Sequence, residues 1–350
     1  MKTAVILFNL GGPDSPEAVR PFLKNLFSDP AIIGVPQPFR WLLSELLSRR
    51  RAPIAREIYA KIGGRSPILP QTEDQAKALE TWLLANGVDA RAFIAMRYWK
   101  PFAAETADAV RAFGPERIVL VPLYPQYSTT TSASSIAAWD RAALTAGVRA
   151  DTKTLCCFPE ETGFVRAYAD LLRSELEKTQ GGAKLRVLFS AHGLPERVIQ
   201  RGDPYQFQVE RTADAIAKLV GETMPDWRVT YQSKVGPLKW IGPATDEEIA
   251  RAGSEGTGLV IVPLAFVSEH SETLVELDIE YRELAHEKGV PVYRRVPAVG
   301  THPEFIAGLG AAILRTLKGG KICGGGADGR RLCPAAFGKC PMSADGVGHA

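Results

Sequence analysis

The sequence predicts an α/β fold in which parallel β-sheets are covered by helices. Short apolar runs of strand length recur along the chain, and longer stretches with helical periodicity separate them. Strands are expected at Val5–Leu10, Arg117–Leu123, Leu185–Phe189, Arg228–Gln232 and Gly258–Phe266. The clearest helices are expected at Asp74–Asn86, Glu105–Phe113, Gly163–Lys178 and Val209–Leu219. Because ligands of such sheets bind at the carboxyl ends of the strands, we expect the chemistry just after each apolar run.

Composition excludes several classes of protein. The 350 residues are 45% apolar, enough to build a large core, so the chain is not disordered. Lys and Arg number 42 against 39 Asp and Glu, a balance of +3 that lacks the basic excess of a nucleic-acid binder. No stretch reaches the roughly 18 apolar residues of a membrane span, and the first apolar run has no signal-peptide cleavage motif. We therefore expect a cytoplasmic protein with no nucleic-acid partner.

Two pairs of strand ends resemble one another. Residues 6–13 (ILFNLGGP) echo residues 188–195 (LFSAHGLP), and the triplet VPL occurs at both 121–123 and 262–264. The echoes predict two similar α/β halves, 1–180 and 181–318, although strand-and-turn patterns can also recur by chance. The tail, residues 319–350, is rich in Gly and Cys and too poor in apolar residues to fold by itself.

Residues 21–53 carry a different pattern, in which large apolar side chains run into the basic cluster Arg49–Arg51. This pattern is typical of a flap that enters an anionic membrane surface. A buried helical hairpin with a solvated basic end is the alternative. A subunit interface would use the same apolar surface, so a monomer and a homodimer both stay open. An apolar flap would also suit a flat apolar ligand.

His192 is the most informative single residue. It follows a buried apolar run and precedes Gly193-Leu194-Pro195, so we expect its imidazole on a tight turn at a strand end. A neutral imidazole there can accept a proton near cellular pH or coordinate a metal ion. A buried histidine bonded to backbone groups is the structural alternative.

The second informative strand end is the segment 268–276 (SEHSETLVE). Its carboxylates Glu272 and Glu276 are four residues apart, on one helical face, and His270 precedes them. Like charges at that spacing destabilise a helix unless something positive compensates, and a divalent cation or a proton relay would do so. A solvated acidic first turn, favoured by the helix dipole, is the alternative.

Other strand ends combine aromatic and polar residues, as at 97–99 (RYW), 124–131 (YPQYSTTT) and 232–240 (QSKVGPLKW). Arg50, Arg51, Tyr59 and Ser66 are candidates for the same rim. Aromatic rings with cationic side chains would suit a planar ligand that carries carboxylates. No nucleotide-binding fingerprint is present.

Several of these motifs together resemble the hallmark motifs of ferrochelatases. The strongest are SAHGLP at 190–195, QSKVGP at 232–237 and SEHSETL at 268–274. FNLGGP at 8–13, residues 59–68, Arg97-Tyr98, YPQYS at 124–128 and RGDPY at 201–205 follow in the family's order. The resemblance covers most of the chain.

The resemblance implies two Rossmann-like halves around a porphyrin cleft. It also implies a lyase that inserts Fe2+ into protoporphyrin IX to give protohaem, in the last step of haem biosynthesis, with no nucleotide or organic cofactor. His192 and Glu272 match the family's catalytic metal-site pair, and Glu276 would begin an exit for protons. Substrate-binding roles are expected for Arg51, Tyr59, Ser66, Arg97, Tyr98, Tyr124 and Gln126.

The cysteine tail resembles that of ferrochelatases with a 2Fe-2S cluster, which requires four ligands. Cys323, Cys333 and Cys340 would supply three. The fourth would be Cys157, with Cys156 as the alternative, because strand alternation lets only one of the two face the tail. Animal members of the family carry this ligand at a position occupied here by Ala167, so the resemblance does not extend to that position. A tail with free thiols is the alternative.

Three other functions compete with the expected one. A coproporphyrin ferrochelatase or a cobalt chelatase would use the same pair with a different rim. A non-catalytic haem or metal carrier would need ligands but no route for protons. The carboxylates at 272 and 276 would form such a route, so they favour the enzyme over the carrier. The location is expected to be cytoplasmic, with peripheral contact at the inner face of a membrane if the flap enters the lipid.

Overall fold

A computed structural model describes residues 1–179, 184–319, 322–323 and 331–342. The chain divides into two compact units. The first comprises Met1–Leu123 and Ser128–Thr154, and the second comprises Tyr124–Tyr127 and the chain from Leu155 onward.

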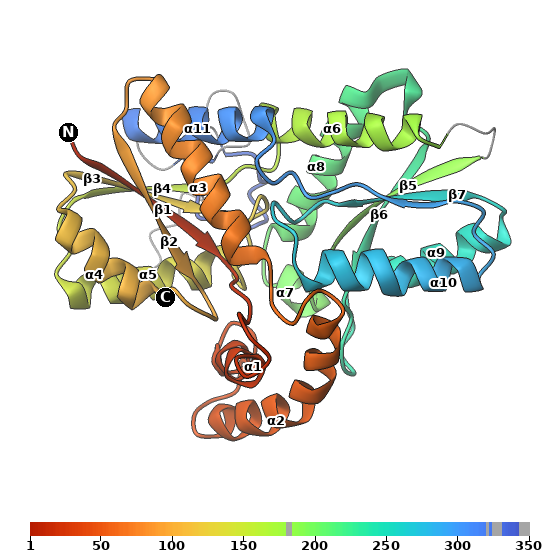
Figure 1. The fold of residues 1–350 in the computed structure, drawn as a ribbon, viewed down its shortest axis with the longest axis horizontal. Helices are drawn as coiled ribbons and strands as arrows, with labels where there is room; N and C mark the ends of the chain where they lie inside the picture. Colours follow the sequence, from red (N-terminus) through yellow and green to blue (C-terminus); the bar gives the residue numbers. More distant parts are fainter. Residues whose placement is uncertain (180–183, 320–321, 324–330, 343–350) are drawn as a thin grey trace. The chain divides into compact units, whose positions relative to one another are not determined.

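The first unit is built on a parallel sheet. Its strands are β1 (Thr3–Asn9), β2 (Ala90–Met96), β3 (Arg117–Pro122) and β4 (Asp151–Cys157), in the spatial order β2-β1-β3-β4. The central strand β1 is buried along its whole length, with Leu7 opposite Ile94 and Val121. Helices α3 (Ile68–Ala85), α4 (Ala103–Phe113) and α5 (Ser132–Ala146) connect the strands, α3 on one face and α4 with α5 on the other (Figure 1). Right-handed crossovers dictate this placement, because the chain moves across the sheet in opposite directions.

The second unit repeats the arrangement. Strands β5 (Leu185–His192), β6 (Asp226–Gln232), β7 (Gly258–Pro263) and β8 (Tyr293–Arg295) form a parallel sheet in the order β6-β5-β7-β8. Its helices are α6 (Thr162–Glu177), α7 (Glu196–Gln200), α8 (Tyr205–Val220), α9 (Thr245–Ser254), α10 (Tyr281–Glu287) and α11 (Pro303–Lys318). Strand β9 (Ile322–Cys323) pairs with the end of β4. The strand order matches that of the first unit position by position, so the predicted α/β fold with two similar halves is confirmed.

The sequence echoes fall on equivalent strands. Residues 6–13 and their echo 188–195 lie at the carboxyl ends of β1 and β5. The two VPL triplets lie at the carboxyl ends of β3 and β7. Each pair occupies the same position in its sheet. The strand ends that the sequence singled out are therefore the same two positions of a repeated scaffold.

The second unit begins earlier than the sequence predicts. Apart from Tyr124–Tyr127, it starts at Leu155, within β4, whereas the predicted boundary at 180–181 lies outside the described residues. Helix α6 packs against α8 and α11 of the second unit. A Cβ on Gly163 would lie 2.2 Å from the carbonyl oxygen of Glu304, and one on Gly308 would lie 2.0 Å from Oε2 of Glu161. This close packing places α6 in the second unit.

Residues 21–53 belong to a hairpin of two helices, α1 (Val19–Ser28) and α2 (Phe39–Ala60). Ser44, Ser48 and Ala52 are buried at a spacing of four, so the inner face of α2 consists of small residues from position 44 to position 52. Glu45 is paired with Lys24 at 2.9 Å, with Arg49 at 2.8 Å and with Arg20.

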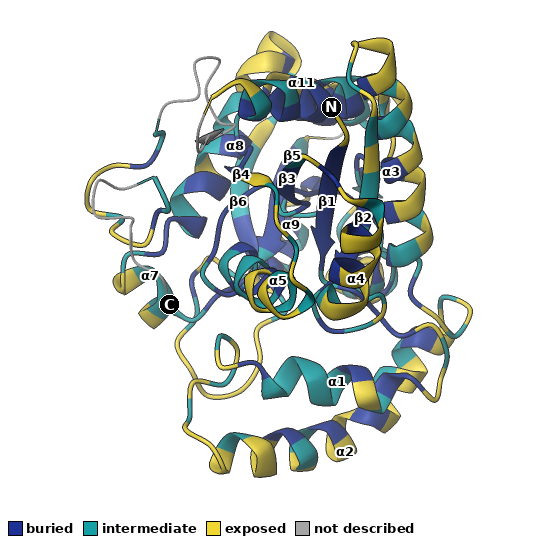
Figure 2. Ribbon diagram, turned by 90° about the vertical axis from the view of Figure 1, so that its left-hand side faces the viewer, coloured by how far each residue is buried: buried dark blue, intermediate teal, exposed yellow. Residues whose placement is uncertain are grey.

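The large apolar residues of α2 lie on its outer surface, in contrast to the alternative of a buried hairpin. The exposed side chains are Phe39, Trp41, Leu42, Leu43, Leu46 and Ile54. Figure 2 shows exposed and half-buried residues along the hairpin. Among the described residues, no helix has both the length and the apolar character needed to cross a bilayer.

Candidate active site

His192 is the last residue of β5, in the middle of the second sheet. Its Nδ1 lies 2.9 Å from Oε2 of Glu272, and their side chains are 37% and 26% exposed. The structure therefore brings together the two residues that the sequence singled out, 80 positions apart, at the carboxyl end of a parallel strand.

The turn after His192 fixes the position of this residue. The N–H of Gly193 donates to the carbonyl of Gln232 at 2.9 Å. A Cβ at position 193 would lie 3.0 Å from that carbonyl oxygen and 3.1 Å from the ring of Trp240, so a side chain there would force one of these neighbours to shift. On the other side, the hydroxyl of Tyr205 donates to the carbonyl of His192 at 3.0 Å.

Glu272 begins a π-helix, Glu272–Glu280, where the sequence predicted an ordinary helical turn. Such a helix is rare and is frequently found at functional sites. His270 lies just before it, with Nε2 3.9 Å from Oε2 of Glu272 and its ring 4.4 Å from that of Phe266. His270 is buried, whereas His192 is partly exposed. The two imidazoles thus approach one carboxylate.

Glu276 accepts hydrogen bonds from four donors. The N–H and Oγ of Ser233 donate at 2.8 and 2.5 Å, Nε2 of Gln232 at 3.2 Å and the hydroxyl of Tyr281 at 3.1 Å. Ser233 has a φ of 65°, an uncommon value for a residue other than glycine. The carboxylate of Glu276 therefore ties the π-helix to the strained turn at the end of β6.

Electrostatics separate the two imidazoles. Burial lowers the pKa of His192, but the adjacent Glu272 carboxylate more than offsets this and raises the pKa above 6.5. Burial raises the pKa of Glu272, but the charge of His192 lowers it to about 2. For His270, burial outweighs the nearby carboxylates and lowers the pKa. Burial and the charge of Glu272 raise the pKa of Glu276.

These values define what the pair can do. An ionised Glu272 only accepts hydrogen bonds, so Nδ1 of His192 carries the proton between them. Nε2 of a neutral His192 then keeps a lone pair that can accept a proton or bind a metal ion. The structure describes no cluster of three or more His, Cys, Asp or Glu side chains that could hold a metal ion.

The predicted rim residues of the first unit surround a buried carboxylate that the sequence did not reveal. Asp29 accepts from Nη2 of Arg97 at 2.7 Å, the hydroxyl of Tyr98 at 2.8 Å and Oγ of Ser134 at 2.5 Å. The guanidinium of Arg97 also lies 5.0 Å from the centre of the Tyr98 ring. Asp29 directly follows α1, and no sequence pattern marks it as a site residue. Its role is visible only from its contacts in the structure, such as that with Arg97.

The other predicted rim residues of this unit differ in exposure. Arg51 is exposed on α2, whereas Tyr59 and Ser66 are buried. Ser66 lies beside the end of β1, where its N–H donates to the carbonyl of Pro13 at 2.8 Å. A Cβ on Gly12 would lie 2.5 Å from the Ser66 side chain, so Gly12 permits this approach.

Tyr124 and Gln126 belong to the second unit. Tyr124 is half-buried, whereas Gln126 is 1% exposed. Nε2 of Gln126 donates to Oγ1 of Thr212 at 3.1 Å and contacts the carbonyl of Leu264 at 3.4 Å. These contacts lie inside the unit and give no geometric support to the substrate role predicted for Gln126.

Among the described side chains, four cysteine thiols are buried in the second unit: Cys156, Cys157, Cys333 and Cys340. The side-chain amide of one glutamine, Gln208, donates to Sγ of Cys333 at 3.1 Å and of Cys157 at 3.6 Å. A hydrogen bond with Cys340, together with burial, raises the pKa of Cys333.

Two further observations concern the adjacent cysteines. The backbone of Cys157 pairs with that of Cys323 in β9, while the side chain of Cys323 lies outside the described residues. Sγ of Cys156 lies 3.1 Å from Sγ of Cys157.

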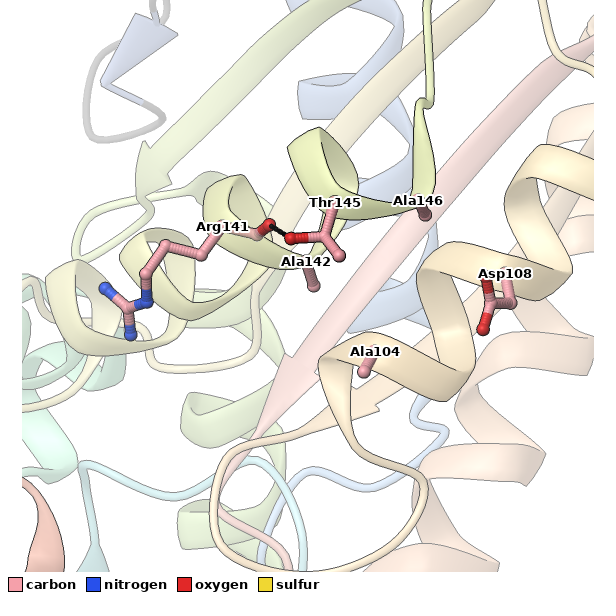
Figure 3. A pocket seen from close by; sticks show the side chains of 6 residues that line it. All are labelled: Ala104, Asp108, Arg141, Ala142, Thr145 and Ala146. Carbon is pink, nitrogen blue, oxygen red and sulfur yellow. Dashed lines mark hydrogen bonds between the residues drawn. The ribbon is translucent and has the colours of Figure 1, made fainter.

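A shallow hollow of about 330 Å³ lies between α4 and α5, away from the predicted residues (Figure 3). Its lining consists of Ala104, Asp108, Arg141, Ala142, Thr145 and Ala146. These side chains are small or exposed and include no histidine or cysteine, so the hollow offers no chemistry comparable to the His192 site.

Solved structures define the class of the fold. SirB from Bacillus subtilis, solved with Fe3+, aligns with a TM-score of 0.51 over 90% of this chain and 96% of its own, at 16% identity. DR2241 from Deinococcus radiodurans, which is described as structurally similar to chelatases, aligns with a TM-score of 0.51 over 94% of this chain and 55% of its own, at 14% identity. The chain thus has a chelatase-like fold.

Sequence comparison is more specific. The ferrochelatase family model matches residues 2–317. A ferrochelatase of Phenylobacterium zucineum is 56% identical over 97% of this chain and 98% of its own length. One of Caulobacter vibrioides is 55% identical over 97% of both chains. The chain belongs to the ferrochelatase family, as the motifs predicted.

The pH dependence of His192 tests the electrostatics of the pair. In the intact protein we expect an imidazole pKa above 6.5. The ion pair then stabilises the fold fully at pH values below 6.5, down to the range where Glu272 protonates, and is lost as pH rises through the raised pKa. In Glu272→Gln, burial and the charge of Glu276 remain but the Glu272 carboxylate is gone, so the pKa of His192 should fall from its raised value.

NMR titration of the imidazole protons measures the pKa of His192 in the wild type and in Glu272→Gln. The variant His270→Gln serves to assign the His270 signal among those of the five histidines. An unchanged His192 pKa in Glu272→Gln would show that Glu272 does not control this imidazole.

Proposed function

We propose that this chain is a porphyrin metal chelatase, a lyase, that inserts Fe2+ into protoporphyrin IX to give protohaem in the last step of haem biosynthesis. The proposal depends on one observation above all. In a chain that belongs to the ferrochelatase family, His192 meets Glu272 at the carboxyl end of the central strand β5.

The reaction exchanges two protons for one metal ion. Fe2+ loses its water ligands and gains four ring nitrogens, and the porphyrin releases two pyrrole protons. Nε2 of neutral His192 accepts a pyrrole proton or presents the metal, and Glu272 stabilises the imidazolium that forms. Glu272 also completes the metal site, and Glu276 begins the exit for protons.

Two pyrrole protons leave slowly from a planar ring, so binding must bend it. Remote contacts can supply this distortion, of order 1 to 5 kcal/mol. We assign the grip to Arg97, Tyr98, Tyr59 and the α1–α2 hairpin, with Arg51, Ser66, Tyr124 and Gln126 as further substrate-binding candidates. The buried Asp29 supports this assignment because it holds Arg97 and Tyr98 in fixed positions.

A coproporphyrin ferrochelatase and a cobalt chelatase are the competing enzymes, and a haem or metal carrier is the competing non-enzyme. Competition between the two porphyrins, and between Fe2+ and Co2+, separates the enzymes. Turnover itself excludes the carrier.

Replacement of the imidazole tests the assigned base. His192→Ala should abolish Fe2+ insertion and leave porphyrin binding measurable, because the substitution removes the proton acceptor and none of the proposed grip. The assay is anaerobic incubation with Fe2+ and protoporphyrin IX followed by absorbance, with binding measured by fluorescence quenching. Retained turnover would rule out His192 as the essential group.

We further propose that Cys157, Cys323, Cys333 and Cys340 hold a 2Fe-2S cluster. Buried thiols are the donors such a cluster requires. The Gln208 amide directed at Cys157 and Cys333 resembles the hydrogen bonds that orient ligand sulfurs. The same contact, together with the backbone pairing of Cys157 and Cys323, favours Cys157 over Cys156. When bound, the cluster would supply a one-electron centre and a clip for the tail.

Adjacent cysteines give a matched pair of variants for the cluster. Wild-type protein purified without oxygen should be coloured and contain iron and acid-labile sulfide. Cys157→Ser should lose both, and Cys156→Ser should keep them, because only Cys157 is assigned as a ligand. Colourless, iron-free wild-type protein would reject the cluster, and the reverse result for the two variants would move the ligand to Cys156.

The exposed face of α2 supports a further proposal, namely peripheral contact with the inner face of a membrane by a cytoplasmic enzyme. Apolar side chains face outward there, and Arg49, Arg50 and Arg51 follow them on the same helix, as anionic lipid would favour. The alternative occupant of this face is a second copy of the chain, which would make the enzyme a homodimer.

Vesicle binding distinguishes the two occupants of this face. The double variant Leu42→Glu, Leu46→Glu should no longer sediment with anionic vesicles, because charges would replace the exposed apolar contacts. The control is Leu84→Glu, Leu144→Glu, which changes exposed leucines on α3 and α5. The face is a subunit interface if the wild-type protein does not sediment with the vesicles and has the solution mass of a dimer. In that case the Leu42→Glu, Leu46→Glu variant should have the mass of a monomer.

A further inference from the structure

One arginine joins the two ends of the segment that carries His270, Glu272 and Glu276. Nη1 of Arg295, the last residue of β8, lies 2.9 and 3.1 Å from the two carboxylate oxygens of Glu269. Its Nη2 lies 2.6 Å from Oδ2 of Asp278. Glu269 immediately precedes His270, and Asp278 lies on the π-helix two residues beyond Glu276. The guanidinium therefore spans the segment from before its first functional residue to after its last.

The three charged groups are held in place by further contacts. The side chain of Arg295 is only 8% exposed, that of Glu269 14% and that of Asp278 27%. Oε1 of Glu269 also accepts from the N–H of Ala298 at 2.9 Å, and Oδ1 of Asp278 accepts from Arg282 at 2.9 Å. A planar guanidinium that reaches two carboxylates through two different nitrogens fixes their directions as well as their distances, which the single ammonium group of a lysine could not reproduce.

The segment needs such support. Glu269, Glu272, Glu276, Asp278 and Glu280 place five carboxylates within twelve residues. A π-helix is an uncommon backbone form. Strained or uncommon backbone forms persist where the surrounding structure holds them. Without a cation between its ends, repulsion between these carboxylates would favour other arrangements of the backbone. Glu272 would then leave the position that brings its Oε2 within 2.9 Å of His192.

We propose that Arg295 is a positioning residue for metal insertion, acting through Glu269 and Asp278 to hold Glu272 against His192. This inference rests on the proposed function, because it takes the His192–Glu272 pair as the site of insertion. Arg295 touches neither substrate in this account. Its loss should therefore change the rate of insertion and leave porphyrin affinity unchanged.

The chain offers a matched control in Arg186. It lies near the start of β5, its side chain is 4% exposed, and it pairs with Asp226 at 2.6 Å and Glu255 at 2.9 Å. It thus resembles Arg295 in burial and in having two carboxylate partners, but it contacts neither end of the 269–278 segment. Any general loss of activity or stability caused by disturbing a buried ion pair should appear in the variants of both arginines.

The test compares Arg295→Lys and Arg295→Met with Arg186→Lys and Arg186→Met. For folded Arg295→Lys we expect kcat to fall by about tenfold to a hundredfold, with the KM for porphyrin within about twofold of wild type. Arg186→Lys should keep the wild-type kcat. Circular dichroism and thermal unfolding establish which variants are folded, and if the methionine variants are not, the lysine pair decides.

A double-mutant cycle identifies the route. If Arg295 acts through Glu269, then Glu269→Gln should slow insertion by itself, and the two changes together should cost less than the product of their separate effects. A wild-type kcat in folded Arg295→Lys would overturn the proposal, as would an equal loss in Arg186→Lys. Glu272→Gln, assayed in parallel, tests the proposed function separately, because its retained turnover would reject the insertion site whatever Arg295 does.

Discussion

The contact between His192 and Glu272 is the interaction on which the rest of the site depends. It joins the carboxyl end of a buried central strand to the first residue of a π-helix. It also sets the charges, since the carboxylate raises the pKa of one imidazole while burial lowers that of its neighbour His270. The glycine at 193, the Tyr205 hydroxyl and the Arg295 ion pairs all help to hold these two side chains in contact.

The two units share a strand order but differ at the equivalent strand end. In the sequence echo, Leu10 stands where His192 stands in the second unit. Asn9 beside it is buried and bonded to Thr72 at 3.1 Å. The end of β1 therefore provides packing and a close approach for Ser66, whereas the end of β5 provides a titratable pair. A repeated scaffold can carry different tasks at the same position because chemistry resides in a few side chains.

Sequence patterns could predict the features that depend on local order. Continuous apolar runs identified β1, β3, β5 and β7, and the polar residues at the end of β5 and after β7 identified His192 and Glu272. Strands β2 and β4 were not predicted, because Arg91, Asp151 and Lys153 interrupt their apolar pattern. Asp29 and Arg295 could not be found either, since their importance arises from partners far away in the chain. The π-helix escaped prediction because tertiary contacts, rather than residue spacing, select its wider turn.

The central claim is that His192 and Glu272 act as one unit in metal insertion. The most direct measurement is the rate of anaerobic Fe2+ insertion into protoporphyrin IX by His192→Ala, by Glu272→Gln and by the double variant. If the pair acts as a unit, the double variant will be no slower than the slower single variant, because the first substitution already removes the shared function. If the two losses multiply, the residues act independently and the account is contradicted.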